Sequence, residues 1–299
     1  MHQAAVRTTP TRSRLGAYLA LTKPRIIELL LVTTVPTQVV AARGLPSGWL
    51  VFWTVLGGTL AAGGANAINM VVDRDIDRLM ERTKGRPLVT GEIGPAPALA
   101  FAIGLEVAAF ALLWAKVNLL SAVLATSACL FYVFVYTLWL KRTSTSNIVI
   151  GGAAGAVPVL VGWSSVTGGL DWAPIVLFVV IFVWTPPHFW ALAIKYSDDY
   201  RAADVPMLPA VASLRATSVR IVAYTVLLWA LTIVFSPVAG MGHLYLGAAV
   251  VLGGVYLWLA VGLLRDPSTK VAMRLFSWSI TYITLLFGAM ALDQLLRAG

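Results

Sequence analysis

The feature that most constrains this chain is the recurrence of apolar segments long enough to cross a lipid bilayer. The hydrocarbon core is about 30 Å thick, so a helix needs about 20 mostly apolar residues to span it. Of the 299 residues 59% are hydrophobic and only 12% are charged, far from the composition of a soluble domain. The sequence therefore predicts an all-α polytopic membrane protein. We expect a bundle of nine transmembrane helices, over residues 26–42, 50–72, 96–114, 118–139, 147–163, 172–194, 217–237, 244–264 and 275–296.

The distribution of basic residues predicts the orientation of these helices. With an inside N-terminus, all but three of the 22 Lys and Arg residues fall on the inner side, the exceptions being Arg43, Lys116 and Arg297, as the positive-inside rule requires. We therefore expect a basic cytoplasmic tail over residues 1–25 and a single transmembrane domain over residues 26–299. The net charge of +9 is explained by this topology and by attraction to membrane lipid, so no nucleic-acid partner is expected. The predicted location is the inner (plasma) membrane.

The stretch Asn66–Gly91 joins an apolar segment directly to a dense block of charge. If the helix continues, Asn69, Asp73 and Asp77 follow at intervals of four and face the same way, whereas Asp75 faces away. Two carboxylates about 6 Å apart repel by roughly 3 kcal/mol at an effective dielectric constant of ~20, so the pair needs a counter-charge. A hard cation such as Mg²⁺, which prefers carboxylates, waters and substrate phosphates, would supply it.

Three basic residues, Arg82, Lys84 and Arg86, follow the carboxylates within one loop. Their side chains are suited to the outer oxygens of a phosphate or diphosphate group. The alternative is a solvated helix end with mixed charges. Lys141 and Arg142, after the fourth predicted helix, are by default an ordinary positive-inside pair.

The sixth predicted helix carries a second group of polar residues near its inner end. Two prolines, Pro186 and Pro187, are expected to bend or unwind the helix there. His188 follows them directly, and it is either a ligand-binding residue or a hydrogen-bonded structural one. Lys195 and Asp199 lie in the next inner loop, four spans after the first acidic loop and on the same side.

These features suit the ionisation of an allylic diphosphate inside an apolar bundle. Mg²⁺ and basic side chains would stabilise the charge on the leaving diphosphate, and apolar helices would keep water from the allylic cation. The sequence holds none of the usual signatures of serine hydrolases, P-loop enzymes or zinc peptidases.

Several stretches of the sequence resemble the UbiA-type intramembrane prenyltransferase superfamily. The spacing of Asn69, Asp73 and Asp77 resembles its first aspartate motif. The longer stretches are similar to one branch of it, the protoheme IX farnesyltransferases or heme O synthases. Those stretches are DRDID at 73–77, RTKGRPL at 82–88, YT at 136–137, KRT at 141–143, NIVIGG at 147–152, PHFW at 187–190, DY at 199–200 and MLP at 207–209.

The resemblance implies that a cavity at the inner side takes farnesyl diphosphate and heme B. Farnesyl transfer to a heme vinyl group, followed by addition of water, would give heme O for heme A and terminal oxidase biogenesis. A downstream heme A synthase or oxidase assembly factors are the implied partners.

The resemblance also implies roles for individual residues. Mg²⁺ would be the cofactor, and its implied ligands are Asn69, Asp73, Asp77 and Asp199. Lys195 would complete the catalytic set. The implied substrate-binding residues are Arg82, Lys84, Arg86, Lys141, Arg142, His188 and Tyr200.

The sequence departs from the superfamily pattern at one place and leaves three alternatives open. The second aspartate motif usually has two aspartates four residues apart, but Ala203 stands four residues after Asp199. A second Mg²⁺ site would then need Asp198 or Asp204. The alternative functions are prenyl transfer to an aromatic quinone precursor, membrane transport, and heme handling without catalysis.

Overall fold

A computed structural model describes residues 12–298, so residues 1–11 of the predicted basic tail and Gly299 lie outside the described part. Within this part, nine helical segments are long and apolar enough to cross a membrane, as predicted. Their bounds differ from the predicted ones by a few residues at most ends. They are α2 (Pro24–Ala41), α3 (Gly48–Val72), α6 (Pro95–Lys116), Leu119–Thr143, α9 (Asn147–Thr167), α10 (Trp172–Lys195), α13 (Leu214–Val238), α14 (His243–Arg265) and α15 (Thr269–Ala298).

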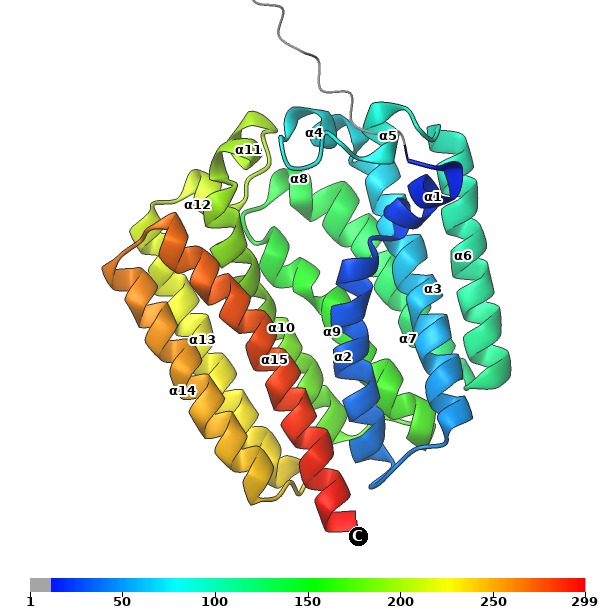
Figure 1. The fold of residues 1–299 in the computed structure, drawn as a ribbon, viewed down its shortest axis with the longest axis vertical. Helices are drawn as coiled ribbons and strands as arrows, with labels where there is room; N and C mark the ends of the chain where they lie inside the picture. Colours follow the sequence, from blue (N-terminus) through cyan, green and yellow to red (C-terminus); the bar gives the residue numbers. More distant parts are fainter. Residues whose placement is uncertain (1–11, 299) are drawn as a thin grey trace, which may run out of the picture.

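Short helices gather at one end of the bundle, the upper end in Figure 1. We call this end the loop face and the other end the opposite face. The short helices are α1 (Arg14–Thr22), α4 (Arg74–Leu79), α5 (Pro87–Thr90), α8 (Lys141–Thr143), α11 (Ser197–Ala202) and α12 (Leu208–Val211). The helix over residues 14–22 was not predicted. The loop face is therefore a layer of short elements over the ends of the long helices.

Several helices begin at a capping side chain or at a proline. Asn118 and Ser213 each accept a hydrogen bond from a backbone N–H in the first turn of the helix that follows, as N-cap residues do. Pro24, Pro87 and Pro95 occupy first positions, where the missing N–H costs nothing. Local sequence thus fixes these five helix starts.

Close helix packing in the bundle depends on glycines at the contacts. A Cβ added at Gly253 of α14 would lie 2.1 Å from Trp229 of α13, and one added at Gly151 of α9 would lie 2.3 Å from Tyr136. Small residues of this kind let helix backbones approach each other where burial from water cannot drive association. The largest core cluster involves α10, α13, α14 and α15.

The fourth membrane segment changes its winding near the loop face. It begins as α7 (Leu119–Leu130), continues as the π-helix η1 (Phe131–Leu140) and ends as α8. The rings of Tyr132 and Tyr136 stack with centroids 5.3 Å apart, and the Thr137 hydroxyl donates to the Tyr132 carbonyl. The sequence predicted one helix here but not its π winding, which is frequent at functional sites.

Pro186 and Pro187 were predicted to bend or unwind the sixth helix, and the helix does not unwind. Both prolines lie inside α10, which is helical from Trp172 to Lys195. The Thr185 hydroxyl donates to the carbonyl of Ile181 within the same helix, and both prolines are buried against neighbouring helices. Packing against neighbouring helices therefore keeps the helix intact where the two prolines lack a backbone N–H donor.

The glycine contacts generate a test of the packing. Gly253→Ala should destabilise the protein by about 1–3 kcal/mol, since the methyl group of the new alanine would overlap Trp229. Gly247→Ala on the same helix is the matched control, because a Cβ there meets no atom within 4 Å. It should be neutral or stabilising by at most about 1 kcal/mol. Melting of the two purified variants in detergent checks this, and equal melting temperatures would contradict the account.

Candidate active site

The acidic turn lies where α3 passes into α4 at the loop face. Asp73 is the residue between the two helices, and the bonds from Asp73 N to Asn69 O (2.9 Å) and from Asp77 N to Asp73 O (2.8 Å) keep the helical spacing. The Asn69 amide donates to the Asp73 carboxylate at 2.7 Å. Asp73 and Asp77 are buried, with 0% and 1% exposure. The three side chains therefore share one face, as predicted.

Asp75 points away from this cluster, also as predicted. Its carboxylate is 61% exposed and accepts two hydrogen bonds of 2.8 Å from Arg142. The hydrogen bond from Arg142 holds the pKa of Asp75 at about 2. Arg142 also lies 3.8 Å from Asp73, so it borders the cluster from the side.

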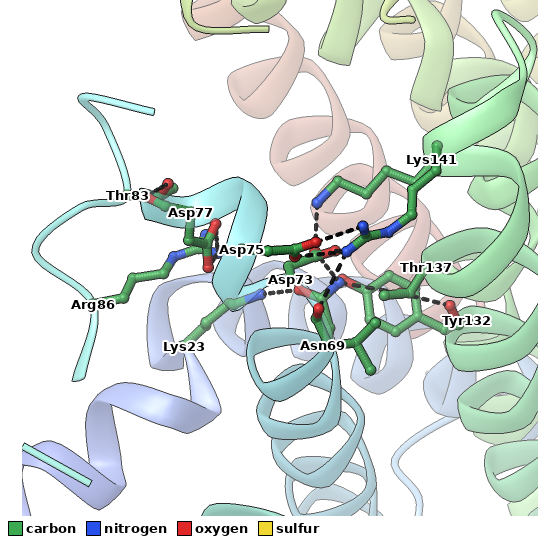
Figure 2. Close-up of polar contacts among 12 residues, drawn as sticks. Lys23, Asn69, Asp73, Asp75, Asp77, Thr83, Arg86, Tyr132, Thr137 and Lys141 are labelled. Atoms are coloured by element: carbon green, nitrogen blue, oxygen red, sulfur yellow. Dashed lines mark hydrogen bonds and ion pairs between the residues drawn. The ribbon is translucent and has the colours of Figure 1, made fainter. Parts of the chain in front are cut away.

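Cationic side chains from three separate elements neutralise the acidic cluster, as Figure 2 shows. Lys141 of α8 pairs with Asp73. Arg86, just before α5, donates to both oxygens of Asp77, at 2.8 and 2.6 Å. Lys23, between α1 and α2, donates to the Asn69 side-chain oxygen at 2.7 Å. The protein itself thus supplies the counter-charge that the buried carboxylates need.

Lys23 is the site residue that sequence reasoning missed. Its backbone has a φ of +52°, a left-handed conformation that is costly for residues with a Cβ, and this turn aims the side chain into the cluster. Burial, together with the nearby charges of Arg86 and Lys141, lowers the pKa of Lys23 to about 7. The available signal was a lysine directly before the proline that opens the first membrane helix.

One carboxylate oxygen of the cluster is left for a ligand. Within residues 12–298, Asp73 Oδ1 is buried and has no hydrogen-bond partner. No group of three or more His, Cys, Asp or Glu side chains converges in this part of the chain. Mg²⁺ is usually held by one or two carboxylates plus waters and substrate phosphates. The residues present therefore fit a magnesium ion that arrives together with a phosphate-bearing substrate.

The second acidic loop, predicted to lie on the same side as the first, contacts it. Asp199 of α11 accepts a hydrogen bond of 3.1 Å from the backbone N–H of Arg82. The Arg82 guanidinium and the Lys195 ammonium lie 5.4 and 5.3 Å from the ring centroid of Tyr196, within the range of cation–π attraction. Tyr200 is buried next to them, and this burial raises its pKa.

Three predicted or suggested residues do not reach the cluster. Lys84 is exposed and pairs with Glu81 three residues before it, because the turn after α4 directs it outward. Asp198 is 95% exposed and pairs with Arg201. Asp204 has a φ of +51° and borders a separate cavity of about 230 Å³ beside Asp75 and Arg142. The structure therefore offers no replacement for the aspartate missing at position 203.

His188 lies in the packed interior of the bundle. Its ring stacks between Trp184 (centroids 4.3 Å apart) and Phe276 (4.7 Å), and its Nδ1 is 2.6 Å from the Ser279 hydroxyl. Both faces of the imidazole are thus covered and one nitrogen is occupied. This geometry favours the structural alternative for His188, and its role toward heme stays a prediction.

The π-helix η1 borders the acidic cluster. Thr137 Oγ1 accepts a hydrogen bond of 3.1 Å from the Asn69 amide. The stacked pair Tyr132 and Tyr136 lies on the same element, and Figure 2 places Tyr132 beside Thr137. Aromatic faces therefore lie next to the polar cluster, at the boundary between charged and apolar parts of the bundle.

Comparison with known proteins relates this geometry to one family. Residues 30–287 match the UbiA prenyltransferase family. The chain is 52% identical to protoheme IX farnesyltransferase of Streptomyces avermitilis, over 96% of both chains.

Solved structures share the fold at low sequence identity. A structure of digeranylgeranylglyceryl phosphate synthase superposes with a TM-score of 0.77 at 16% identity, over 95% of this chain and 99% of that one. A UbiA homolog from Archaeoglobus fulgidus bound to GPP and Mg²⁺ gives a TM-score of 0.62 at 18% identity, over 92% and 99%.

The different positions of Lys23 and Lys84 generate a binding test. Lys23→Gln should weaken the binding of inorganic diphosphate with Mg²⁺ at least about tenfold, the effect of losing one charged hydrogen bond. Lys84→Gln, the matched control, should change it less than about threefold, since an exposed pair contributes little. Calorimetric titration of the detergent-purified variants measures both affinities. Equal losses, or a larger loss for Lys84, would refute this arrangement.

Proposed function

Because this chain belongs to the UbiA prenyltransferase family, we propose that it transfers the farnesyl group of farnesyl diphosphate to a vinyl group of heme B, giving heme O. The acceptor is proposed from the 52% identity with the Streptomyces avermitilis farnesyltransferase across nearly the whole chain. The diphosphate donor is supported by the chemistry of the site itself.

The observation that carries the proposal is the buried pair Asp73 and Asp77 at the end of an apolar bundle, with one free carboxylate oxygen and cations on all sides. Asn69, Asp73 and Asp77 would hold Mg²⁺, with Asp199 close by on the adjoining loop. Mg²⁺, when bound, neutralises charge on the diphosphate and so favours its departure. The binding of GPP and Mg²⁺ by the Archaeoglobus fulgidus homolog supports this assignment.

The reaction balances with one water molecule. The C1–O bond of farnesyl diphosphate breaks, and its electron pair leaves with the diphosphate. The terminal carbon of the heme vinyl group then bonds to C1 of the farnesyl cation, which leaves a cation on the carbon next to the porphyrin ring. Water adds to that carbon and releases a proton, so the products are heme O, diphosphate and a proton.

Basic residues of the chain would bind the diphosphate by changing partners. Lys23, Arg86 and Lys141 each contact an oxygen of the acidic cluster, and phosphate oxygens would compete for the same N–H groups. Arg82, in the loop after α4, and Lys195, the last residue of α10, would close over the outer oxygens. Hydrogen-bond donors that are already in place would thus stabilise the negative charge that develops on the leaving diphosphate.

The apolar part of the bundle would protect the farnesyl cation. Its helices exclude water from the allylic carbons until transfer is complete. The rings of Tyr132 and Tyr136 lie beside the polar cluster, and their faces attract a cation. These residues would therefore stabilise the farnesyl cation until the heme vinyl group attacks it.

The placement of the polar residues argues against the other function classes. Transporters hold their ionisable residues near the middle of the membrane on broken helices, whereas this cluster lies at the loop face and α10 is continuous. Heme handling without catalysis leaves the buried carboxylate pair without a purpose.

We assign the protein to the plasma membrane with the loop face in the cytoplasm, because within residues 12–298 all Lys and Arg residues except Arg43, Lys116 and Arg297 lie toward this face, as the positive-inside rule requires of the cytoplasmic side. Membrane lipid surrounds the bundle in this arrangement. The product would pass to a downstream heme A synthase or to oxidase assembly factors.

The two aspartates of one turn give a matched pair of variants. Asp73→Asn should lower farnesyl transfer at least about 100-fold, because it removes the charge that holds the metal and diphosphate. Asp75→Asn should change it less than about fivefold, since an exposed ion pair contributes up to about 1 kcal/mol. Mass spectrometry of heme extracted after incubation with heme B, farnesyl diphosphate and Mg²⁺ measures the product. Near-normal product from folded Asp73→Asn would remove Asp73 from the metal site.

The source of the hydroxyl group is a separate prediction. Incubation in ¹⁸O-labelled water should give heme O whose mass is higher by the difference between the two oxygen isotopes. A farnesylated heme that is formed without the label, or without any hydroxyl oxygen, would contradict the step in which water quenches the cation.

A further inference from the structure

A second cavity lies at the opposite face of the bundle, away from the acidic cluster. Its volume is about 650 Å³ and it is bounded by the ends of α2, α9, α10, α13 and α15. These ends lie together at the lower side of Figure 1. The volume falls within the range of small-molecule binding sites, and no step of the proposed reaction uses it.

The cavity combines apolar walls with basic groups. Val40 and the Trp163 ring form part of the apolar wall, whereas Arg43 and Arg297 supply positive charge and Asp171 negative charge. Both Val40 and Trp163 are buried. Such a lining suits a molecule that has an apolar body and an anionic group.

Two of the three charged groups already have structural partners. Asp171 accepts a hydrogen bond from Ala173 N at the start of α10. Arg297 contacts the Gly240 carbonyl and Asp293. By contrast, the Arg43 guanidinium makes no ion pair or hydrogen bond with any residue in the range 12–298. It is the cation that remains for a ligand.

The backbone of Arg43 points to a use for its side chain. Arg43 follows the end of α2 with a φ of +52°, and its N–H bonds to the Val40 carbonyl at 3.0 Å. Helices that end in this left-handed conformation usually have glycine there. Arg43 keeps this conformation at the rim of the cavity, where it is exposed, and backbone strain of this kind clusters at ligand-binding sites.

The cavity lies at the depth of lipid head groups. Trp172 borders it and is 77% exposed, and Trp49 and Trp114, at the same face, are 71% and 59% exposed. Exposed tryptophans at helix ends are typical of the membrane–water interface. Trp163 forms part of the cavity wall, and its indole N–H has no hydrogen-bond acceptor in the described part of the chain.

We propose that this cavity binds the anionic head group of a membrane amphiphile, with Arg43 on its phosphate or carboxylate. Two sources share this chemistry. One is an anionic phospholipid of the surrounding leaflet. The other is the porphyrin product, whose carboxylates would dock here on release, and this second source rests on the proposed function.

The test uses the full chain, purified in detergent and stripped of lipid. Binding of phosphatidylglycerol, phosphatidylcholine and protoporphyrin IX is measured by native mass spectrometry for wild type, Arg43→Gly and Arg43→Gln. Lys116→Gln is the matched control, because Lys116 also lies at the opposite face but contacts Trp53 and does not border the cavity. Melting temperatures are recorded without ligand.

Both Arg43 variants should bind one anionic ligand at least tenfold more weakly than wild type, and Lys116→Gln should bind it normally. Arg43→Gly should at the same time melt at the wild-type temperature or above it, since glycine relieves the left-handed turn. A loss confined to phosphatidylglycerol identifies a phospholipid site, and this result stands even if farnesyl transfer is never observed. A loss confined to protoporphyrin identifies a product site. Unchanged binding of both ligands, or an equal loss in Lys116→Gln, would overturn the proposal.

Discussion

The burial of two carboxylates at the end of an apolar bundle is the constraint on which the rest of this structure depends. Asp73 and Asp77 lie one helical turn apart with almost no exposure, and such a pair would repel by roughly 3 kcal/mol at an effective dielectric constant of ~20. Arg86 and Lys141 offset that repulsion by pairing directly with the carboxylates, and Lys23 lies beside them on the Asn69 amide oxygen. Because these cations come from three distant parts of the sequence, their attraction to the carboxylates ties α1, α5 and α8 to the end of α3.

The same contacts support the proposal that the site takes a charged substrate rather than a permanent ion. Each cation donates to the cluster through N–H groups that could also donate to phosphate oxygens. One oxygen of Asp73 accepts no hydrogen bond from any residue in the range 12–298, although Arg142 lies 3.8 Å from it. A magnesium diphosphate would therefore exchange partners with groups already present, without burying new unpaired charge. The hydrogen bond between Asn69 and Thr137 anchors this exchange to η1, whose aromatic rings begin the apolar part of the site.

Much of this arrangement was predictable from the sequence. The nine spans follow from apolar length, and the shared face of Asn69, Asp73 and Asp77 follows from helical periodicity, since both depend on local sequence. Lys23 was missed because only the tertiary fold brings the α1–α2 junction to Asn69. Lys84 was assigned to phosphate from its neighbours in sequence, yet a local pair with Glu81 holds it outside. Packing also keeps α10 helical through its prolines, and residues 131–140 wind as a π-helix. The periodicity of apolar residues predicts neither feature.

The measurement that tests the central claim most directly is an experimental structure with Mg²⁺ and a non-hydrolysable farnesyl diphosphate analogue. The account predicts Mg²⁺ at about 2.0–2.1 Å from oxygens of the Asp73 and Asp77 carboxylates and of the diphosphate. Lys23 and Lys141 should then contact phosphate oxygens. A diphosphate bound elsewhere, with Lys141 still on Asp73 and Arg86 still on Asp77, would contradict the account.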